Sequence, residues 1–205
     1  GYRHLDLREN LEVNELFMGS PGGPNAGVMG AVFDKFRTTN SFNGAMVGLL
    51  YQREVGRWNL GLNTRLAVGA TNQTLDVVGG QTQVGAGAVT ATVPGGLLAL
   101  NSNIGHYSKN RIAFVPEVGV TLGYDITPRL QATVGYSLIY WSRVIRPGDQ
   151  VDQVLDLTRV PILNDPRVFT QAANVASVRT LHPAPLMKES DLWVQGVSFG
   201  LKYAW

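Results

Sequence analysis

The chain has 205 residues, enough for one domain with its own core, and it contains no cysteine, which excludes disulfides, thiolate chemistry and cysteine-ligated metals. A net charge of +2, without a basic run interleaved with aromatic residues, gives no indication of nucleic-acid binding. The chain has 24 glycines and only 16% charged residues, and no run of about 18 apolar residues that could form a transmembrane helix.

The first predicted strand covers residues 1–13, where apolar and polar residues alternate with the period of two that is typical of a β-strand. Leu5, Leu7, Leu11 and Val13 share the apolar face, and the opposite face is polar. The segment SPGGPNAG follows, and its glycine and proline density predicts a loop, which we place at about 14–41.

Two more strands are predicted at 42–54 and 58–75, joined by a short turn at 55–57. In the first of them we place Ala45, Val47, Leu49 and Tyr51 outward. In the second, an apolar set that begins at Trp58 lies opposite a polar set that includes Asn59 and Gln73. Residues 76–110 are rich in glycine and small polar residues and are predicted to form a second long loop.

The clearest signal is a hairpin of two long strands, 111–126 and 129–145, joined at Thr127-Pro128-Arg129. A third long loop is predicted at 147–190, because its five prolines argue against a central strand. The last strand, 192–205, alternates up to its final residue. Its apolar positions Val197, Phe199, Leu201, Tyr203 and Trp205 are similar to the C-terminal signal that the barrel-assembly machinery reads in outer-membrane proteins.

Short turns (55–57, 127–129) alternate strictly with long loops (14–41, 76–110, 147–190). Outer-membrane barrels have short periplasmic turns and long extracellular loops. The pattern therefore predicts an all-β fold, an antiparallel up-and-down transmembrane β-barrel in the bacterial outer membrane, with residues 1–205 as its single domain.

Six strands are fewer than the eight or more that a closed single-chain barrel needs, and an open sheet edge cannot face lipid. Residues 28–40 and 76–93 could supply two strands, N-terminal strands could lie outside this chain, or several copies could close the barrel jointly. We favour additional strands over joint closure.

In a barrel the polar faces line the lumen, where charged side chains tune ion selectivity. Both signs of charge are present, so we expect no strong ion preference; the alternative is that these residues pair with one another and fill a narrow lumen. The predicted lumen-facing residues are Asp6, Arg8, Glu12, Arg53, Arg65, Glu117, Asp125, Arg143 and Lys202.

Other chemistry is weakly indicated. Ser102, Asn103 and His106 superficially offer a phospholipase set but crowd one glycine-rich loop. Asp149 and Asp152 are weak candidates for a cation site, although a turn is the favoured interpretation of RPGDQVD. We therefore expect no enzymatic activity, no cofactor and no metal.

Four segments carry a family resemblance: DKFRTTNSFNGAMVGL, GGLLALNSNIGHYSKN, FVPEVGVTLGYDITPRLQATVGYSLIYWSRVIRPGDQVD and LWVQGVSFGLKYAW. They resemble the C-terminal portion of a bacterial outer-membrane β-barrel porin family, beta-barrel porin seven. The resemblance implies an outer-membrane location and a barrel architecture, and it allows that N-terminal strands are missing here.

The leading hypothesis is an outer-membrane barrel that passes small solutes or ions by diffusion. The alternative is a structural or assembly component with a closed lumen, which binds envelope partners through its long loops. Expected partners are outer-membrane lipid, the barrel-assembly machinery during biogenesis, and copies of itself or other envelope proteins, but no nucleic acid.

Overall fold

A computed structural model of the chain describes residues 1–22, 26–84, 90–156, 159–161 and 181–204. Within these residues no helix is long and apolar enough to cross a membrane. The elements are β1 (Tyr2–Met18), β2 (Met29–Val55), β3 (Trp58–Val84), β4 (Thr90–Pro94), β5 (Gly105–Thr127), β6 (Leu130–Ile145), the 3-10 helix η1 (Pro147–Gln150) and β7 (Glu189–Tyr203).

The strands form one antiparallel sheet in the order β1-β2-β3-β5-β6-β7, with β4 paired to the far end of β3. Apart from the short β4, neighbours in sequence are neighbours in the sheet, as expected for up-and-down topology. In the described residues β1 and β7 are the sheet edges and do not pair with each other, so the sheet is open. The all-β antiparallel prediction is confirmed; closure is not shown.

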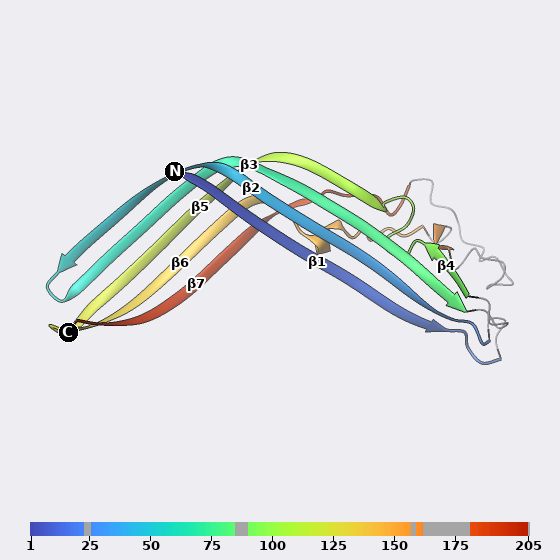
Figure 1. Cartoon of the computed structure of the whole chain (residues 1–205), viewed down its shortest axis with the longest axis horizontal. Helices are drawn as coiled ribbons and strands as arrows, with labels where there is room; N and C mark the ends of the chain where they lie inside the picture. Colours follow the sequence, from blue (N-terminus) through green and yellow to red (C-terminus); the bar gives the residue numbers. More distant parts are fainter. Residues whose placement is uncertain (23–25, 85–89, 157–158, 162–180, 205) are drawn as a thin grey trace.

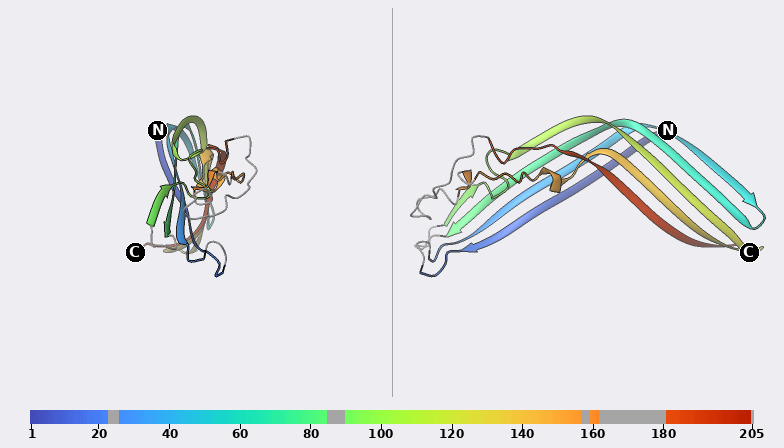
Figure 2. Two further views of the ribbon diagram at one scale, coloured as in Figure 1. Left: turned by 90° about the vertical axis from the view of Figure 1, so that its right-hand side faces the viewer. Right: turned by 180° about the vertical axis from the view of Figure 1, so that it is seen from behind.

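The sheet is sharply bent across its middle, and the long strands run side by side through the bend (Figures 1 and 2). We call the arm that ends at the turns 56–57 and 128–129 the turn-side half, and the other arm the loop-side half. The N-terminus lies near the bend and the C-terminus at the end of the turn-side half (Figure 1).

Glycines make the bend possible. Gly44 and Gly69 are register partners on β2 and β3, and a Cβ on Gly69 would lie 2.1 Å from the carbonyl oxygen of Asn43. A Cβ on Gly44 would lie 2.5 Å from the carbonyl oxygen of Val68. On β6 the bend coincides with a β-bulge between Trp141 and Val144, which adds a residue and bends the strand.

Substituting Gly69→Ala should therefore lower the free energy of unfolding by about 1–3 kcal/mol, as other forced overpacking does. The obstacle is backbone, which cannot rotate away. Gly61→Ala on the same face of β3 is the control, since its Cβ would meet nothing closer than 3.7 Å. Urea unfolding measures both variants, and equal effects would contradict the role of Gly69.

The outward, convex face changes polarity at the bend. In the turn-side half it is apolar on every strand, with three polar exceptions, Arg53, Thr64 and Gln195. In the loop-side half, adjoining the bend, it is polar on β1, β2, β3 and β5. The polar residues there are His4, Asp6, Arg8, Asn10, Glu12, Lys35, Arg37, Thr39, Ser41, Asn43, Asn72, Thr74, Asp76, His106, Ser108 and Asn110.

The concave face shows the opposite change, because the loop-side half encloses a hydrophobic core. Phe42, Trp141 and Val144 are buried in one cluster, and Phe36, Leu75 and Ile145 in another. The segment 95–104, which precedes β5, contributes Ala99 to the second cluster, and the segment 141–152 crosses the concave face at the bend. We call these the two inner segments.

Buried polar side chains of the sheet hold the inner segments. Asp34 accepts hydrogen bonds from the amides of Leu97 (3.1 Å), Leu98 (3.1 Å) and Ala99 (2.7 Å). Asn40 donates to the carbonyl of Ile145 (2.9 Å) and accepts from its amide (2.8 Å). Each bond satisfies a buried backbone group, as a packed interior requires.

Two predicted loops are largely strand, and this corrects their boundaries. Residues 14–41 include the end of β1 and the first half of β2, and residues 76–110 include the end of β3, β4 and the start of β5. Residues 28–40 and 76–93 therefore extend strands already counted, apart from the short β4. The alternation is blurred there because concave positions such as Asp34 and Asn40 are polar yet buried.

Candidate functional site

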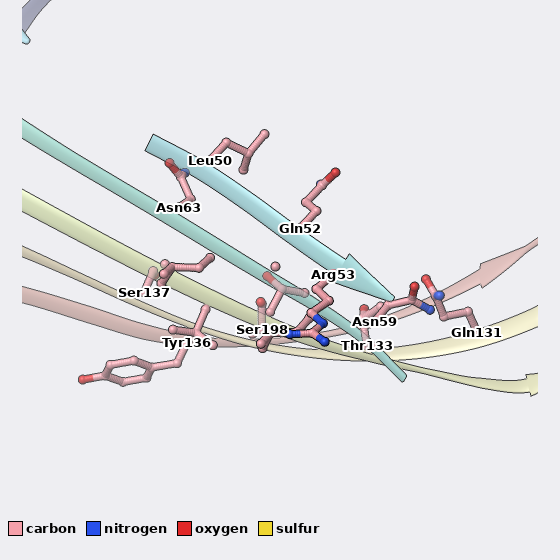
Figure 3. Close-up of a pocket in the computed structure, with 18 of the residues that line it drawn as sticks. Leu50, Gln52, Arg53, Asn59, Asn63, Gln131, Thr133, Tyr136, Ser137 and Ser198 are labelled. Carbon is pink, nitrogen blue, oxygen red and sulfur yellow. The ribbon is translucent and has the colours of Figure 1, made fainter. Parts of the chain in front are cut away.

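A polar groove lies on the concave face of the turn-side half. It encloses about 500 Å³ over β2, β3, β5, β6 and β7. Figure 3 shows residues that line it. Most lining residues that the register puts on the concave face are glycines or uncharged polar residues: Gln52, Asn59, Gly61, Asn63, Gly119, Thr121, Gly123, Gln131, Thr133, Gly135, Ser137 and Ser198. The others are Leu50, Glu54 and Lys202.

The register arranges this face as a checkerboard. Three successive levels across β3, β5, β6 and β7 alternate glycine with a short polar residue. The levels are Asn59-Gly123-Thr133-Gly200, Gly61-Thr121-Gly135-Ser198 and Asn63-Gly119-Ser137-Gly196. No charged residue lies within these twelve positions, so the groove presents neutral hydroxyl and amide groups to its contents.

The groove glycines differ from the bend glycines. A Cβ on Gly61 or Gly119 would have 3.7 or 3.8 Å of clearance, so packing does not demand glycine at either position. Gly135 accommodates its neighbour, because a Cβ there would lie 2.6 Å from Ser198 Oγ. Because these glycines have no side chain, they leave space in the groove above the backbone of the sheet.

Charged residues lie at both ends of the groove. Toward the bend, Glu117 sits between Arg65 and Arg3, with Arg65 Nη1 2.9 Å from Oε1 and Arg3 Nη1 2.9 Å from Oε2. The Arg65 contact is an aligned hydrogen bond, whereas the Arg3 contact is an ion pair without hydrogen-bond alignment. Arg3 was not among the predicted lumen-facing residues.

At the turn end, Asp125 accepts hydrogen bonds from Gln131 (2.7 Å) and Asn59 (3.3 and 3.4 Å). Lys202 is the register partner of Gln131 and so belongs to the same face. The structure therefore places Arg65, Glu117, Asp125 and Lys202 on the polar concave face.

Asp6, Arg8 and Glu12 lie on the opposite, convex face, which corrects their predicted direction. Their register partners on β2 are Ser41, Thr39 and Lys35. The alternation along β1 was identified, but from His4 onward this strand lies in the loop-side half, where the apolar face is the concave one. One strand cannot reveal which face turns inward.

Arg53 and Arg143 also differ from the prediction. Arg53 is the register partner of Leu60, and it extends from β2 to the side opposite Gln52 (Figure 3). Arg143 is exposed in the β6 bulge with φ +56°, and it donates to the carbonyl of Ile112 (3.2 Å). The bulge removes Arg143 from the regular alternation.

The proposed assembly-signal residues share the convex face of the edge strand β7. Val197, Phe199, Leu201 and Tyr203 are exposed, Phe199 at 82%. Trp205 lies outside the described residues. Because β7 is a sheet edge, both its side chains and one row of its backbone groups are open to a partner.

Asp152, one of the two weak metal candidates, has structural partners. Asp152 accepts hydrogen bonds from His182 Nδ1 (2.7 Å) and the amides of Ala184 (2.8 Å) and Val154 (3.0 Å), while Asp149 lies in η1. The described part of the chain holds no group of three metal-ligating side chains.

The phospholipase set does not assemble either. Asn103 bonds to the backbone of Leu98 and Leu100 inside its own segment. His106 pairs with Asp76 across the convex face, with Nδ1 2.6 Å from Oδ1.

The Asp152 cluster should respond to acid. Burial favours the neutral carboxyl, but the hydrogen bonds from His182, Val154 and Ala184 outweigh burial and hold the pKa of Asp152 below its ordinary value. Because the pKa of Asp152 is lower in the folded state, its ionised carboxylate stabilises the fold at any pH above the pKa of the unfolded state. This stabilisation is lost as the pH falls through the pKa of the folded state. The attachment of residues 181–188 should therefore weaken below about pH 4.

The hydrogen-exchange protection factor of the Ala184 amide, corrected for its intrinsic rate, measures this change. Asp152→Asn should abolish the acid dependence, and Asp149→Asn, in η1, should preserve it. An Asp152→Asn profile identical to the parent profile would refute the assignment.

The chain matches the model of the family described as "Putative beta barrel porin-7" over residues 1–205. No curated protein and no solved structure matches the chain.

Proposed function

Because the chain belongs to the family described as Putative beta barrel porin-7, we propose that it forms the wall of an outer-membrane β-barrel that passes small solutes by diffusion. The family name itself suggests a porin in a membrane, while solute passage and the outer membrane are the proposal. The observation that carries it is the turn-side half, whose convex face is apolar while its concave face is a neutral, polar checkerboard.

The dimensions of the apolar face support this function. On β3 it runs from Trp58 to Ala70, about 40 Å along the strand and about 28 Å in height at a tilt of about 45°. That height is close to the apolar band of outer-membrane barrels, about 25 Å.

Aromatic residues lie at both margins of this face. At the turn end Trp58 packs on Tyr124 (centroids 4.8 Å apart), and at the bend Tyr140 packs on Trp193 (4.7 Å). Such aromatic girdles occupy the two membrane interfaces in known barrels. We place the short turns in the periplasm, because outer-membrane barrels have short periplasmic turns.

The neutral lining supports passage of small polar solutes with weak ion selectivity. The side chains of Gln52, Asn63 and Ser137 make no hydrogen bond to other described residues. Their polar groups can therefore bind water and solute hydroxyls in turn. The charged residues at the groove ends are of both signs, and Glu117 is already neutralised by two arginines.

Planar-bilayer recording of the purified protein tests the proposal. We expect stepwise conductance and, across a KCl gradient, a reversal potential near zero. Absence of conductance at any voltage from protein that has demonstrably inserted would refute the porin function.

A second candidate function has its own support: a structural component with a closed lumen. The inner segments fill the concave face of the loop-side half with a buried core, so along this wall the polar groove ends at the bend. Stable insertion without conductance, together with stoichiometric co-purification of an envelope protein, would favour this function.

A further inference from the structure

The change of convex polarity occurs at nearly the same level on β2, β3 and β5. On β3 it falls between Ala70 and Asn72, and on β5 between their register partners Ile112 and Asn110. On β2 it falls one convex position nearer the turns, between Ala45 and Asn43, since Asn43 already pairs with Ala70. The boundary therefore crosses the sheet within one convex position, next to the bend at Gly44 and Gly69.

The convex surface beyond the boundary is unsuited to hydrocarbon. It carries Asp6, Arg8 and Glu12 on β1, and Arg37 on β2, all exposed. Ionisable side chains on the lipid face of a barrel are destabilising near the bilayer centre and are almost absent there. The Lys35–Glu12 pair (2.7 Å) does not change this, because exposed ion pairs of this kind belong in water.

The interior beyond the boundary is closed. The concave face there is a packed core held by Asp34 and Asn40, so next to the bend this half has the pattern of a water-soluble protein, polar outside and apolar inside. Farther from the bend the convex face is apolar again, at Leu16, Phe33 and Val78. The turn-side half has the reverse pattern. A single environment cannot satisfy both halves of the same strands.

We propose that the membrane surface lies at the bend, and that the loop-side half stands in water as a solid extension of the barrel wall. On β2 the extension runs from Met29 to Asn43, roughly 50 Å along the strand at about 3.3 Å per residue. The convex face of the turn-side half contacts lipid hydrocarbon. The convex face of the loop-side half, where it adjoins the bend, contacts water. The inference rests on the proposed membrane wall and adds where the membrane ends.

Single-cysteine labelling tests this boundary, because the chain has no cysteine of its own. Two register pairs on the convex face provide matched sites: Leu62 with Val120 in the turn-side half, and Thr74 with Ser108 in the loop-side half. Each is replaced by cysteine in full-length protein in phosphatidylcholine nanodiscs, whose two faces are both open to a charged maleimide. The mass shift reports modification.

We expect rapid labelling of the cysteines at Thr74 and Ser108, and labelling at Leu62 and Val120 only after denaturation. Protection at all four sites would show that lipid also covers the loop-side half, overturning the boundary but not the membrane wall. Rapid labelling at all four would show that lipid covers neither half, overturning both.

Discussion

Replacing Leu62 by arginine is expected to weaken folding into a lipid bilayer by about 2–4 kcal/mol, the cost of a cation near the midplane of a barrel's lipid face. Leu62 lies near the middle of the apolar convex face, between Tyr51 on β2 and Val120 on β5. An arginine there cannot reach water without distorting the bilayer. Urea titration of the protein refolded in phosphatidylcholine vesicles measures the change.

Thr74→Arg is the matched control, because Thr74 lies on the same strand and the same face but beyond the bend. If that half stands in water, this substitution should change stability by no more than about 0.5 kcal/mol, as at ordinary surface positions. Similar losses at both positions would contradict the assignment of the two halves to different environments. Similar tolerance at both would contradict the membrane-facing role of the turn-side half.

Replacing Trp141 by alanine should destabilise the protein by about 3–5 kcal/mol, the usual range for a buried tryptophan. Trp141 is buried at the bend, where its ring meets the edge of Phe42 with centroids 6.1 Å apart. Its Nε1 donates to Thr71 Oγ1 (3.1 Å), so the substitution also leaves a buried hydroxyl without its donor. The residue joins the inner segment 141–152 to the sheet.

Trp141→Phe separates these contributions, since it keeps most of the apolar contact and removes the hydrogen bond. It should cost about 1–3 kcal/mol, the penalty for an unsatisfied buried polar group. Denaturant unfolding and the conductance of the two variants are measured together. If Trp141→Ala unfolds like the parent protein, the segment 141–152 is not packed against the sheet as described.

The bend explains why sequence patterns were informative in some regions and misleading in others. Along Trp58 to Ala70 and through the hairpin of β5 and β6, alternation of polarity identified strands and faces, because successive side chains there alternate between an apolar face and a polar face. In β2 the concave positions Asp34 and Asn40 are polar but buried, since they bind backbone groups of the inner segments. Their polarity hides the alternation, so the loop predicted from the glycine and proline density of SPGGPNAG was extended over residues that form a long strand.

Some candidate groove residues were predictable from local alternation, and others depend on how the strands pair. Glu117 and Asp125 follow from the hairpin's alternation, and the structure adds their partners Arg3, Arg65, Asn59 and Gln131. The alternation of glycine with Ser, Thr or Asn along each strand was visible, but the checkerboard arises only when register aligns four strands. Register depends on backbone pairing between distant segments, which local periodicity does not specify.

The sequence by itself determined the strand-rich antiparallel class, the hairpin at 127–129 and the two faces of the turn-side strands, because a period of two is a local property of a β-strand. Only the tertiary structure decided which face of β1 turns inward, how far β2 and β3 extend, and where the convex surface changes from apolar to polar. Those features arise from the bend at Gly44 and Gly69 and from two segments that fold back onto the concave face. The inside of a sheet is defined by what packs on it, and that contact joins residues as distant in sequence as Asn40 and Ile145.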